Sequence, residues 1–201
     1  MAHTLRPFRD YSEHEVLNLF TYSGAAESSS VILTRGAAVK LSAEGFTTGP
    51  SNTGSYKVTE FLGDVGGTAF PFSNSQRFGV RPKVTLATSG DVLGLTLLDV
   101  RELDENGEKL IFNPRKAAEM NVVISGQAVP VLTRGVVLYS GTAITNATAG
   151  QVAVVSGTAG ELANISASAN LARSTATNPE VVVGKFLGNA VNNTALLKIM
   201  L

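Results

Sequence analysis

"LTRG" stands at residues 33–36 of this chain and again at residues 132–135, and these two copies indicate how the chain folds. Each copy follows an apolar run and precedes a run of β-prone residues, which is the composition of a turn between two strands. Glycine supplies the positive φ angle that many such turns require. The sequence therefore predicts two equivalent turns, formed by Arg35 and Gly36 in the first copy and by Arg134 and Gly135 in the second.

The two copies belong to longer segments that resemble each other. Farther along the chain, each copy is followed by an apolar run that contains a single glycine, Gly94 in the first segment and Gly184 in the second. A glycine inside a strand usually marks a bulge or the corner of a barrel. We therefore expect two related β units, residues 31–125 and 126–201, either separate or packed as one body, after an N-terminal arm of residues 1–30.

The remaining sequence has the character of a mainly β protein. From residue 31 onward, β-prone runs alternate with Gly, Ser, Asn and Asp, so we expect one or two small β-barrel or β-sandwich units with little helix. The clearest hairpin joins residues 95–103 to residues 108–112 through Asn106 and Gly107, a pair that favours a tight turn. A short helix is expected at residues 114–120, because proline suits a first helical turn. The expected strands are residues 31–34, 37–42, 56–62, 83–87, 92–103, 108–113, 121–125, 130–139, 151–155, 181–187 and 195–201.

The start of the chain has two interpretations. Pro7 disfavours helix around it, whereas residues 12–15 match a capping box that would begin a helix. Apolar residues between Val16 and Phe20 would then share one helical face. The alternative is a strand over residues 16–22, which the aromatic and β-branched residues there favour. The sequence leaves both interpretations open.

Composition and charge restrict the classes of partner. The chain has 201 residues and no cysteine, which excludes disulfides and thiolate metal ligands. Sixteen basic residues balance sixteen acidic ones, so long-range attraction to nucleic acid or to an anionic membrane is weak, and no apolar run is long enough for a transmembrane helix. The first residues lack an apolar signal segment, from which we expect synthesis and folding in the cytoplasm. Between residues 136 and 172 the only charged residue is Glu161, so we expect β-structure packed against another surface.

Candidate catalytic and metal-binding residues are few. His3 and His14 are the only histidines, and both lie in the arm, so the Ser-His and Cys-His arrangements of nucleophilic enzymes lack a base. Residues 102–107 look like the start of a calcium-binding loop, but the first and twelfth positions do not fit. We therefore expect a protein that is not an enzyme and that has no catalytic, cofactor or metal site.

Three stretches of the sequence point together to a class of protein: LRPFRDY at residues 5–11, GLTLLDVRELDENGEKLIFNPRKAAEMNVVISGQAVPVLTRGVVL at residues 94–138, and VVVGKFLG at residues 181–188. They resemble structural proteins of tailed-bacteriophage virions, in particular the small capsid decoration or cement proteins. The resemblance implies β-barrel or β-tulip domains, often with an N-terminal arm, that clamp onto the outside of the capsid lattice and stabilise the head. It also implies the major capsid protein as partner and the capsid surface as location.

On this interpretation the N-terminal arm would supply the contact with the capsid. Phe8 and Tyr11 are large anchors, and Arg6 and Arg9 can pair with carboxylates of a partner, while Pro7 keeps the segment extended. We expect the arm to contribute affinity for the capsid rather than stability to the fold; the alternative is that Phe8 and Tyr11 pack on the protein's own barrel. The expected interface consists of Leu5, Arg6, Pro7, Phe8, Arg9 and Tyr11.

Two other classes of function are compatible with the same sequence. Another virion component, such as a head fibre, tail or baseplate protein, would share the pattern of short strands and glycines. A carbohydrate-active enzyme would need a pair of carboxylates in a cleft, which the sequence does not locate. Capsid decoration is the preferred interpretation; a homo-oligomer is compatible with it, and neither nucleic acid nor a membrane is an expected partner.

Overall fold

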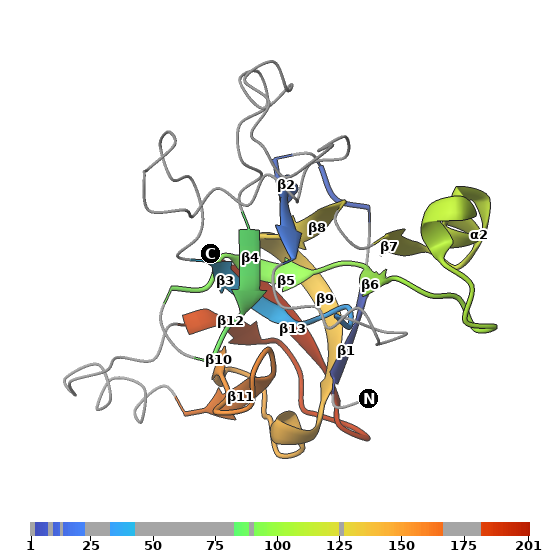
Figure 1. Ribbon diagram of the computed structural model, residues 1–201. Helices are drawn as coiled ribbons and strands as arrows, with labels where there is room; N and C mark the ends of the chain where they lie inside the picture. Colours follow the sequence, from blue (N-terminus) through green and yellow to red (C-terminus); the bar gives the residue numbers. More distant parts are fainter. Residues whose placement is uncertain are drawn as a thin grey trace, which may run out of the picture.

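The computed structural model describes residues 3–7, 10–12, 14–22, 33–42, 83–88, 91–124, 127–166 and 182–201. Of these residues, 52% lie in strands and 9% in helices, so the expected mainly β fold with little helix is confirmed. The strands form a closed barrel, a six-stranded sheet and a separate two-stranded pair (Figure 1). The strand expected at residues 56–62, and the expected interface residues Phe8 and Arg9, lie outside the described residues.

The barrel has the strand order β2-β4-β3-β5-β8. The β2–β4 pair is parallel, whereas the pairing of β2 with β8, which closes the barrel, is antiparallel. Side chains in a strand alternate between its two faces, and those that point inward fill the barrel with an apolar cluster of Phe20, Val39, Val84 and Val131. The strands are β2 (Val16–Tyr22), β3 (Ala38–Leu41), β4 (Lys83–Leu86), β5 (Gly94–Thr96) and β8 (Ala128–Leu132).

Residues 16–22 therefore form a strand and not a helix. The residues of the expected capping box still interact: the Glu15 amide donates to the Ser12 carbonyl at 3.0 Å, and the Ser12 amide donates to the Glu15 carboxylate at 3.0 Å. These bonds close a turn, and the chain then continues into β2. Pairing of β2 with β8 decides between the two interpretations, because it satisfies the backbone groups of an extended segment.

The six-stranded sheet is antiparallel throughout, in the order β1-β9-β13-β12-β10-β11. Its buried face carries the largest side chains of the core, among them Leu5, Tyr139, Phe186 and Leu197. The strands are β1 (His3–Pro7), β9 (Arg134–Gly141), β10 (Val152–Val155), β11 (Leu162–Ile165), β12 (Val182–Phe186) and β13 (Thr194–Met200), with a short 3-10 helix η3 (Thr142–Ile144) after β9.

The low charge of residues 136–172 follows from their place in this sheet. Val137, Tyr139, Ala153 and Leu162 are all buried in the main core cluster. Glu161 is buried too, and its carboxylate accepts hydrogen bonds from the backbone N–H groups that begin η3. In the described part of this stretch, the surface against which it packs is the protein's own core.

The predicted boundaries do not coincide with the barrel and the sheet. The predicted arm, residues 1–30, divides between them, because β1 pairs with β9 in the sheet while β2 pairs with β8 in the barrel. The predicted second unit begins at residue 126, yet β8 completes the barrel and β9 then enters the sheet. A single core cluster includes Leu5, Leu95 and Leu197, so barrel and sheet share one core.

The two LTRG copies are not equivalent, and the prediction of two matching turns is wrong. The first copy is a turn that precedes β3, and the second runs from the end of β8 into β9. Both glycines nevertheless have positive φ angles, +86° at Gly36 and +155° at Gly135. Both also lie against the N-terminal segment: a Cβ atom on Gly36 would come within 2.9 Å of Leu5, and one on Gly135 within 2.6 Å of the Tyr11 ring.

The two strand glycines allow close approach of neighbouring strands, although they lie in different sheets. A Cβ atom on Gly94 in β5 would be 2.4 Å from the Leu132 carbonyl oxygen, and one on Gly184 in β12 would be 2.2 Å from the Lys198 carbonyl oxygen. The ladder between β10 and β12 also shifts register beside Gly184, as expected of a bulge. A strand glycine is thus required at both positions.

A lobe of residues 99–124 projects from the barrel and sheet, which together we call the body (Figure 1). Its two ends pair in parallel as β6 (Asp99–Arg101) and β7 (Val122–Ile124), and between them lie the 3-10 helix η2 (Leu110–Phe112) and the helix α2 (Pro114–Glu119). The predicted helix is confirmed. The predicted hairpin is confirmed only next to its turn. An antiparallel bridge joins Leu103 to Lys109, and the Asp104 amide donates to the Glu108 carbonyl at 2.9 Å. The chain then turns into η2 and does not continue the pairing. The predicted turn at Asn106 and Gly107 does form, with a φ of +84° at Gly107.

Candidate functional site

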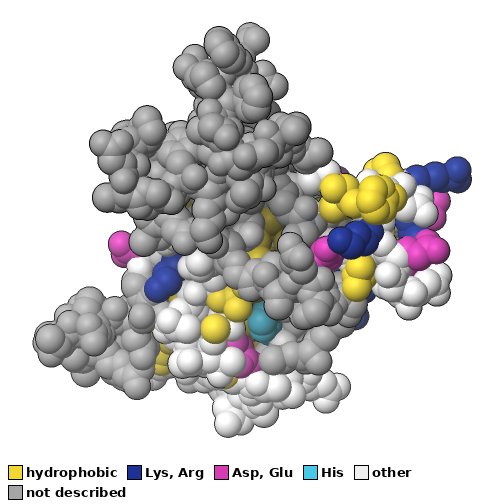
Figure 2. All heavy atoms as spheres, in the orientation of Figure 1, with side chains coloured by type: hydrophobic (Ala, Val, Ile, Leu, Met, Phe, Trp, Pro, Cys, Tyr) yellow, Lys and Arg dark blue, Asp and Glu magenta, His cyan; other side chains and the backbone are white. Residues whose placement is uncertain are grey.

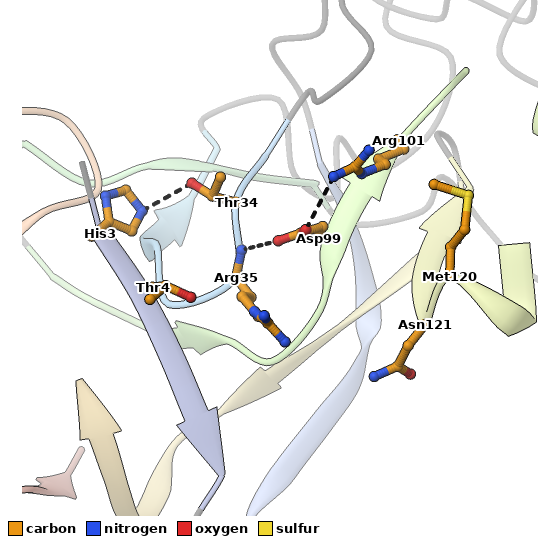
Figure 3. A pocket seen from close by; sticks show the side chains of 8 residues that line it. All are labelled: His3, Thr4, Thr34, Arg35, Asp99, Arg101, Met120 and Asn121. Atoms are coloured by element: carbon orange, nitrogen blue, oxygen red, sulfur yellow. Dashed lines mark hydrogen bonds and ion pairs between the residues drawn. The ribbon is translucent and has the colours of Figure 1, made fainter. Parts of the chain in front are cut away.

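A pocket of about 270 Å³, which we call the seam pocket, lies where the lobe meets the body. Figure 3 shows its lining side chains, which come from four segments that are far apart in the sequence. They are His3 and Thr4 from β1, Thr34 and Arg35 from the first LTRG copy, Asp99 and Arg101 from β6, and Met120 and Asn121 from the end of α2.

The first LTRG turn is fixed in place by backbone contacts on both sides. The Gly36 amide donates to the Thr96 carbonyl at 2.7 Å, and the Thr96 hydroxyl donates to the Thr34 carbonyl at 3.1 Å. On the other side, glycine lets the turn lie directly on β1, since a Cβ atom at residue 36 would be 2.9 Å from the Leu5 nitrogen. The exposed Arg35 is therefore held at the pocket by a rigid turn.

Two guanidinium groups and one carboxylate line the seam pocket, which leaves one excess positive charge. The Arg35 amide donates to Asp99 Oδ1 at 2.7 Å, and the Arg101 guanidinium lies 3.7 Å from Asp99 Oδ2. The Arg35 guanidinium forms no ion pair with any described residue. Arg101 Nε is buried and has no hydrogen-bond partner in the described part of the chain. The carboxylate therefore leaves donor capacity on both arginines unused.

His3 is a second buried polar group at the pocket. Its side chain is nine-tenths buried, with a relative exposure of 9%, and its Nε2 lies 3.2 Å from the Thr34 hydroxyl (Figure 3). The Nδ1 atom is buried without a partner among the described residues. Burial lowers the pKa of His3 below its usual 6.5, so the imidazole is neutral at pH 7. His3 therefore adds a neutral polar side chain to the lining of the pocket and no charge.

The end of α2 supplies the remaining wall. Asn121 has a φ of +53°, in the left-handed region that asparagine tolerates better than most residues, and its amide donates to the Ala118 carbonyl at 3.1 Å. This conformation ends the helix and presents Met120 and Asn121 at the pocket. The lining therefore combines an apolar side chain, an amide, two hydroxyls and the cationic groups, which is a set suited to binding a small anion with an apolar portion.

The structure changes the role of the expected N-terminal interface. Leu5 has 0% exposure and belongs to the main core cluster, so it is not available as a surface anchor. Arg6 and Pro7 are exposed at the end of β1. The Tyr11 ring packs on the core, and its hydroxyl donates to the Val136 carbonyl at 2.5 Å. The expectation that this segment adds affinity without stabilising the fold is therefore wrong for Leu5 and Tyr11.

The lobe carries a different exposed apolar surface, which we call the lobe tip and define as Ile111 and Phe112. Their relative exposures are 52% and 83%. Figure 2 shows hydrophobic side chains gathered on this projecting part of the molecule, beside charged ones. The lobe tip faces solvent although Leu110, directly before it in η2, is fully buried. Sequence reasoning placed both tip residues in a strand and so missed them.

Contacts within the lobe stabilise the segment that carries the lobe tip. Leu110, Ala117 and Ile124 form a small core of their own. The turn that follows β6 is tied to α2 because Lys116 forms an ion pair with Asp104, whose other oxygen accepts amide hydrogen bonds within the turn. This ion pair and these hydrogen bonds hold the pKa of Asp104 below its usual range. The tip is thus presented by a structured support.

Sequence reasoning also missed most of the seam pocket. It named Arg35 only as a turn residue and His3 only as a histidine of the arm, and it did not single out Arg101 or Asn121. An asparagine after the helical run that ends at Met120 is a usual signal for a left-handed helix end, and it could have been noticed. The convergence of four distant segments leaves no local signal.

The described residues offer neither a metal site nor a membrane-spanning helix. No group of three or more His, Asp or Glu residues is placed to hold a metal ion there. None of the helices in those ranges is long and apolar enough to cross a membrane. Comparison with protein-family models, curated proteins and solved structures gives no match for this chain.

Proposed function

We propose that this protein is a capsid decoration or cement protein of a tailed bacteriophage, made in the host cytoplasm and bound to the outer surface of the major capsid lattice. The observation that carries the proposal is the lobe tip, where Phe112 is 83% exposed. A large exposed apolar group on a projecting support is typical of a surface that is covered by a partner. The resemblance of the sequence to virion structural proteins supports the choice of the capsid as that partner.

The lobe tip can supply a useful share of the contact energy. Burying one exposed phenylalanine side chain contributes about 1.5–3 kcal/mol. The small core and the ion pairs of the lobe hold the segment before binding, so less conformational entropy is lost when a partner covers it. Repetition of the same contact over a lattice stabilises the assembled shell even when each single contact is weak.

The proposal is tested on phage particles produced from the genome that encodes this chain. Heads and tails are separated on a density gradient and probed for the chain. We expect it on heads, at many copies per particle. Its presence on tails alone would assign it to another virion component, and its absence from particles would overturn the proposal.

The role of the lobe tip is tested with purified variants added to heads that lack the protein. Phe112→Ala should bind roughly 30-fold more weakly, as for an interface residue worth about 2 kcal/mol. Its melting temperature should not change, because the side chain has few contacts within the chain. Val191→Ala is the matched control, since Val191 is 68% exposed but lies outside the lobe. Equal binding by Phe112→Ala and wild type would show that the lobe tip is not the contact.

A further inference from the structure

We propose that the seam pocket binds a monocarboxylate, supplied either by a small free acid or by an aspartate or glutamate side chain of a partner protein. The inference does not depend on the proposed capsid contact, because neither residue of the lobe tip lines the pocket. It rests on three observations: unused cationic donors, buried polar atoms without partners, and a cavity of suitable size between lobe and body.

The unused donors define the charge of the ligand. Arg35 and Arg101 line the pocket together with a single carboxylate, Asp99, and the guanidinium of Arg35 has no ion pair with a described residue. A guanidinium group presents its N–H donors in a fork that matches a carboxylate. One added carboxylate would balance the one excess positive charge. A phosphate dianion would instead leave a net negative charge beside Asp99, which favours the carboxylate.

Two residues that line the pocket, His3 and Arg101, each have a buried polar atom without a partner among the described residues, which favours a binding site over a plain surface hollow. His3 Nδ1 and Arg101 Nε are both buried without a hydrogen-bond partner in the described structure. Buried polar groups in proteins almost always have a partner, because an unsatisfied one costs about 1–3 kcal/mol. Both residues line the same pocket, and a ligand there could supply a partner for Arg101 Nε.

The size and lining of the cavity define the class of carboxylate. A volume of about 270 Å³ lies just below the usual range for ligand pockets, which begins at about 300 Å³, so the ligand is small. Met120 offers an apolar wall for a short aliphatic portion, while the hydroxyls of Thr4 and Thr34 and the amide of Asn121 can bond the carboxylate oxygens. An amino-acid side chain that ends in a carboxylate, or a short carboxylic acid, has this combination.

The experiment is an NMR titration of the full-length ¹⁵N-labelled protein. The probes are N-acetyl-glutamate α-amide, its neutral analogue N-acetyl-glutamine α-amide, and inorganic phosphate. We expect saturable shifts of the Arg35 and Asn121 amides and of Arg101 Nε with the carboxylate, and weaker or no effects with the other two. Shifts that do not saturate, an equal response to the neutral amide, or tighter binding of phosphate would each overturn the proposal.

A matched pair of variants locates the site. Arg35→Gln removes an exposed guanidinium from the pocket and should weaken carboxylate binding about tenfold. Arg134→Gln makes the same change in the second LTRG copy, outside the pocket, and should bind like wild type. Equal weakening in both variants would overturn the assignment. Melting curves verify that both variants are folded.

A final titration distinguishes the two possible sources of the carboxylate. The same titration is made with a short peptide that contains one glutamate. Tighter binding of the peptide than of the amino-acid derivative supports a partner's side chain, and equal or tighter binding of the derivative supports a free acid. Either result supports carboxylate recognition, whereas binding of neither ligand overturns it.

Discussion

Leu5→Ala tests whether the first strand belongs to the folded core. The Leu5 side chain has 0% exposure and packs in the main cluster, and β1 is paired with β9 along its whole length, from His3 opposite Gly141 to Pro7 opposite Val137. A leucine-to-alanine change at a buried site removes apolar contacts and leaves a cavity, which costs about 2–5 kcal/mol. For a protein of this size each kcal/mol lowers the Tm by about 2–4 °C, so Leu5→Ala should melt roughly 4–20 °C below wild type.

The measurement is thermal unfolding followed by calorimetry or circular dichroism at pH 7.5. Arg6→Ala is the control, because Arg6 is the next residue on the same strand and is exposed. Its effect should stay within about 0.5 kcal/mol, or about 2 °C. If Leu5→Ala melts within 2 °C of wild type, or if Arg6→Ala is equally destabilising, the strand does not contribute to the core and the first residues act as a detachable arm.

Two further variants test the close strand contacts and the buried histidine. Gly184→Ala would place a Cβ atom 2.2 Å from the Lys198 carbonyl oxygen, so its free energy of unfolding in urea should fall by about 2 kcal/mol or more. Gly157→Ala, whose new Cβ would have no atom within 4 Å, should match wild type, and similar losses in both would contradict this reasoning. His3 has a lowered pKa when folded, so below about pH 6.5 the unfolded state binds the extra proton and stability falls as the pH decreases. Urea unfolding at pH 7.5 and 5.5 should show a smaller loss of stability in His3→Gln than in wild type. A His3→Gln loss equal to that of wild type would refute the assignment.

Local sequence patterns were enough to predict the fold class and many of the elements. Residues 37–42, 83–87 and 181–187 were expected as strands and contain β3, β4 and β12. The helix expected at residues 114–120 is α2. These predictions succeed because strand alternation, helix-starting proline and turn glycines act on neighbouring residues and leave a local signal.

Pairing between strands was predicted less well. Residues 95–103 were expected to pair with residues 108–112 across a tight turn, but only the ends next to the turn pair, at Leu103 and Lys109, and β6 pairs with β7. The sequence correctly placed the turn at Asn106 and Gly107, yet a turn does not decide which strands remain together after it. The buried residues Leu110, Ala117 and Ile124 form a separate small core, and their packing draws the chain into η2 and α2.

By itself, the sequence determined that the protein is mainly β, that a turn forms at Asn106 and Gly107, and where the short helix begins. Only the tertiary structure decided that the first strand completes a sheet, that the two LTRG copies have different settings, and that His3, Arg35 and Arg101 line one pocket. The physical reason is that backbone conformation depends largely on adjacent residues, whereas strand partners and pocket walls depend on packing between segments that are distant in the chain.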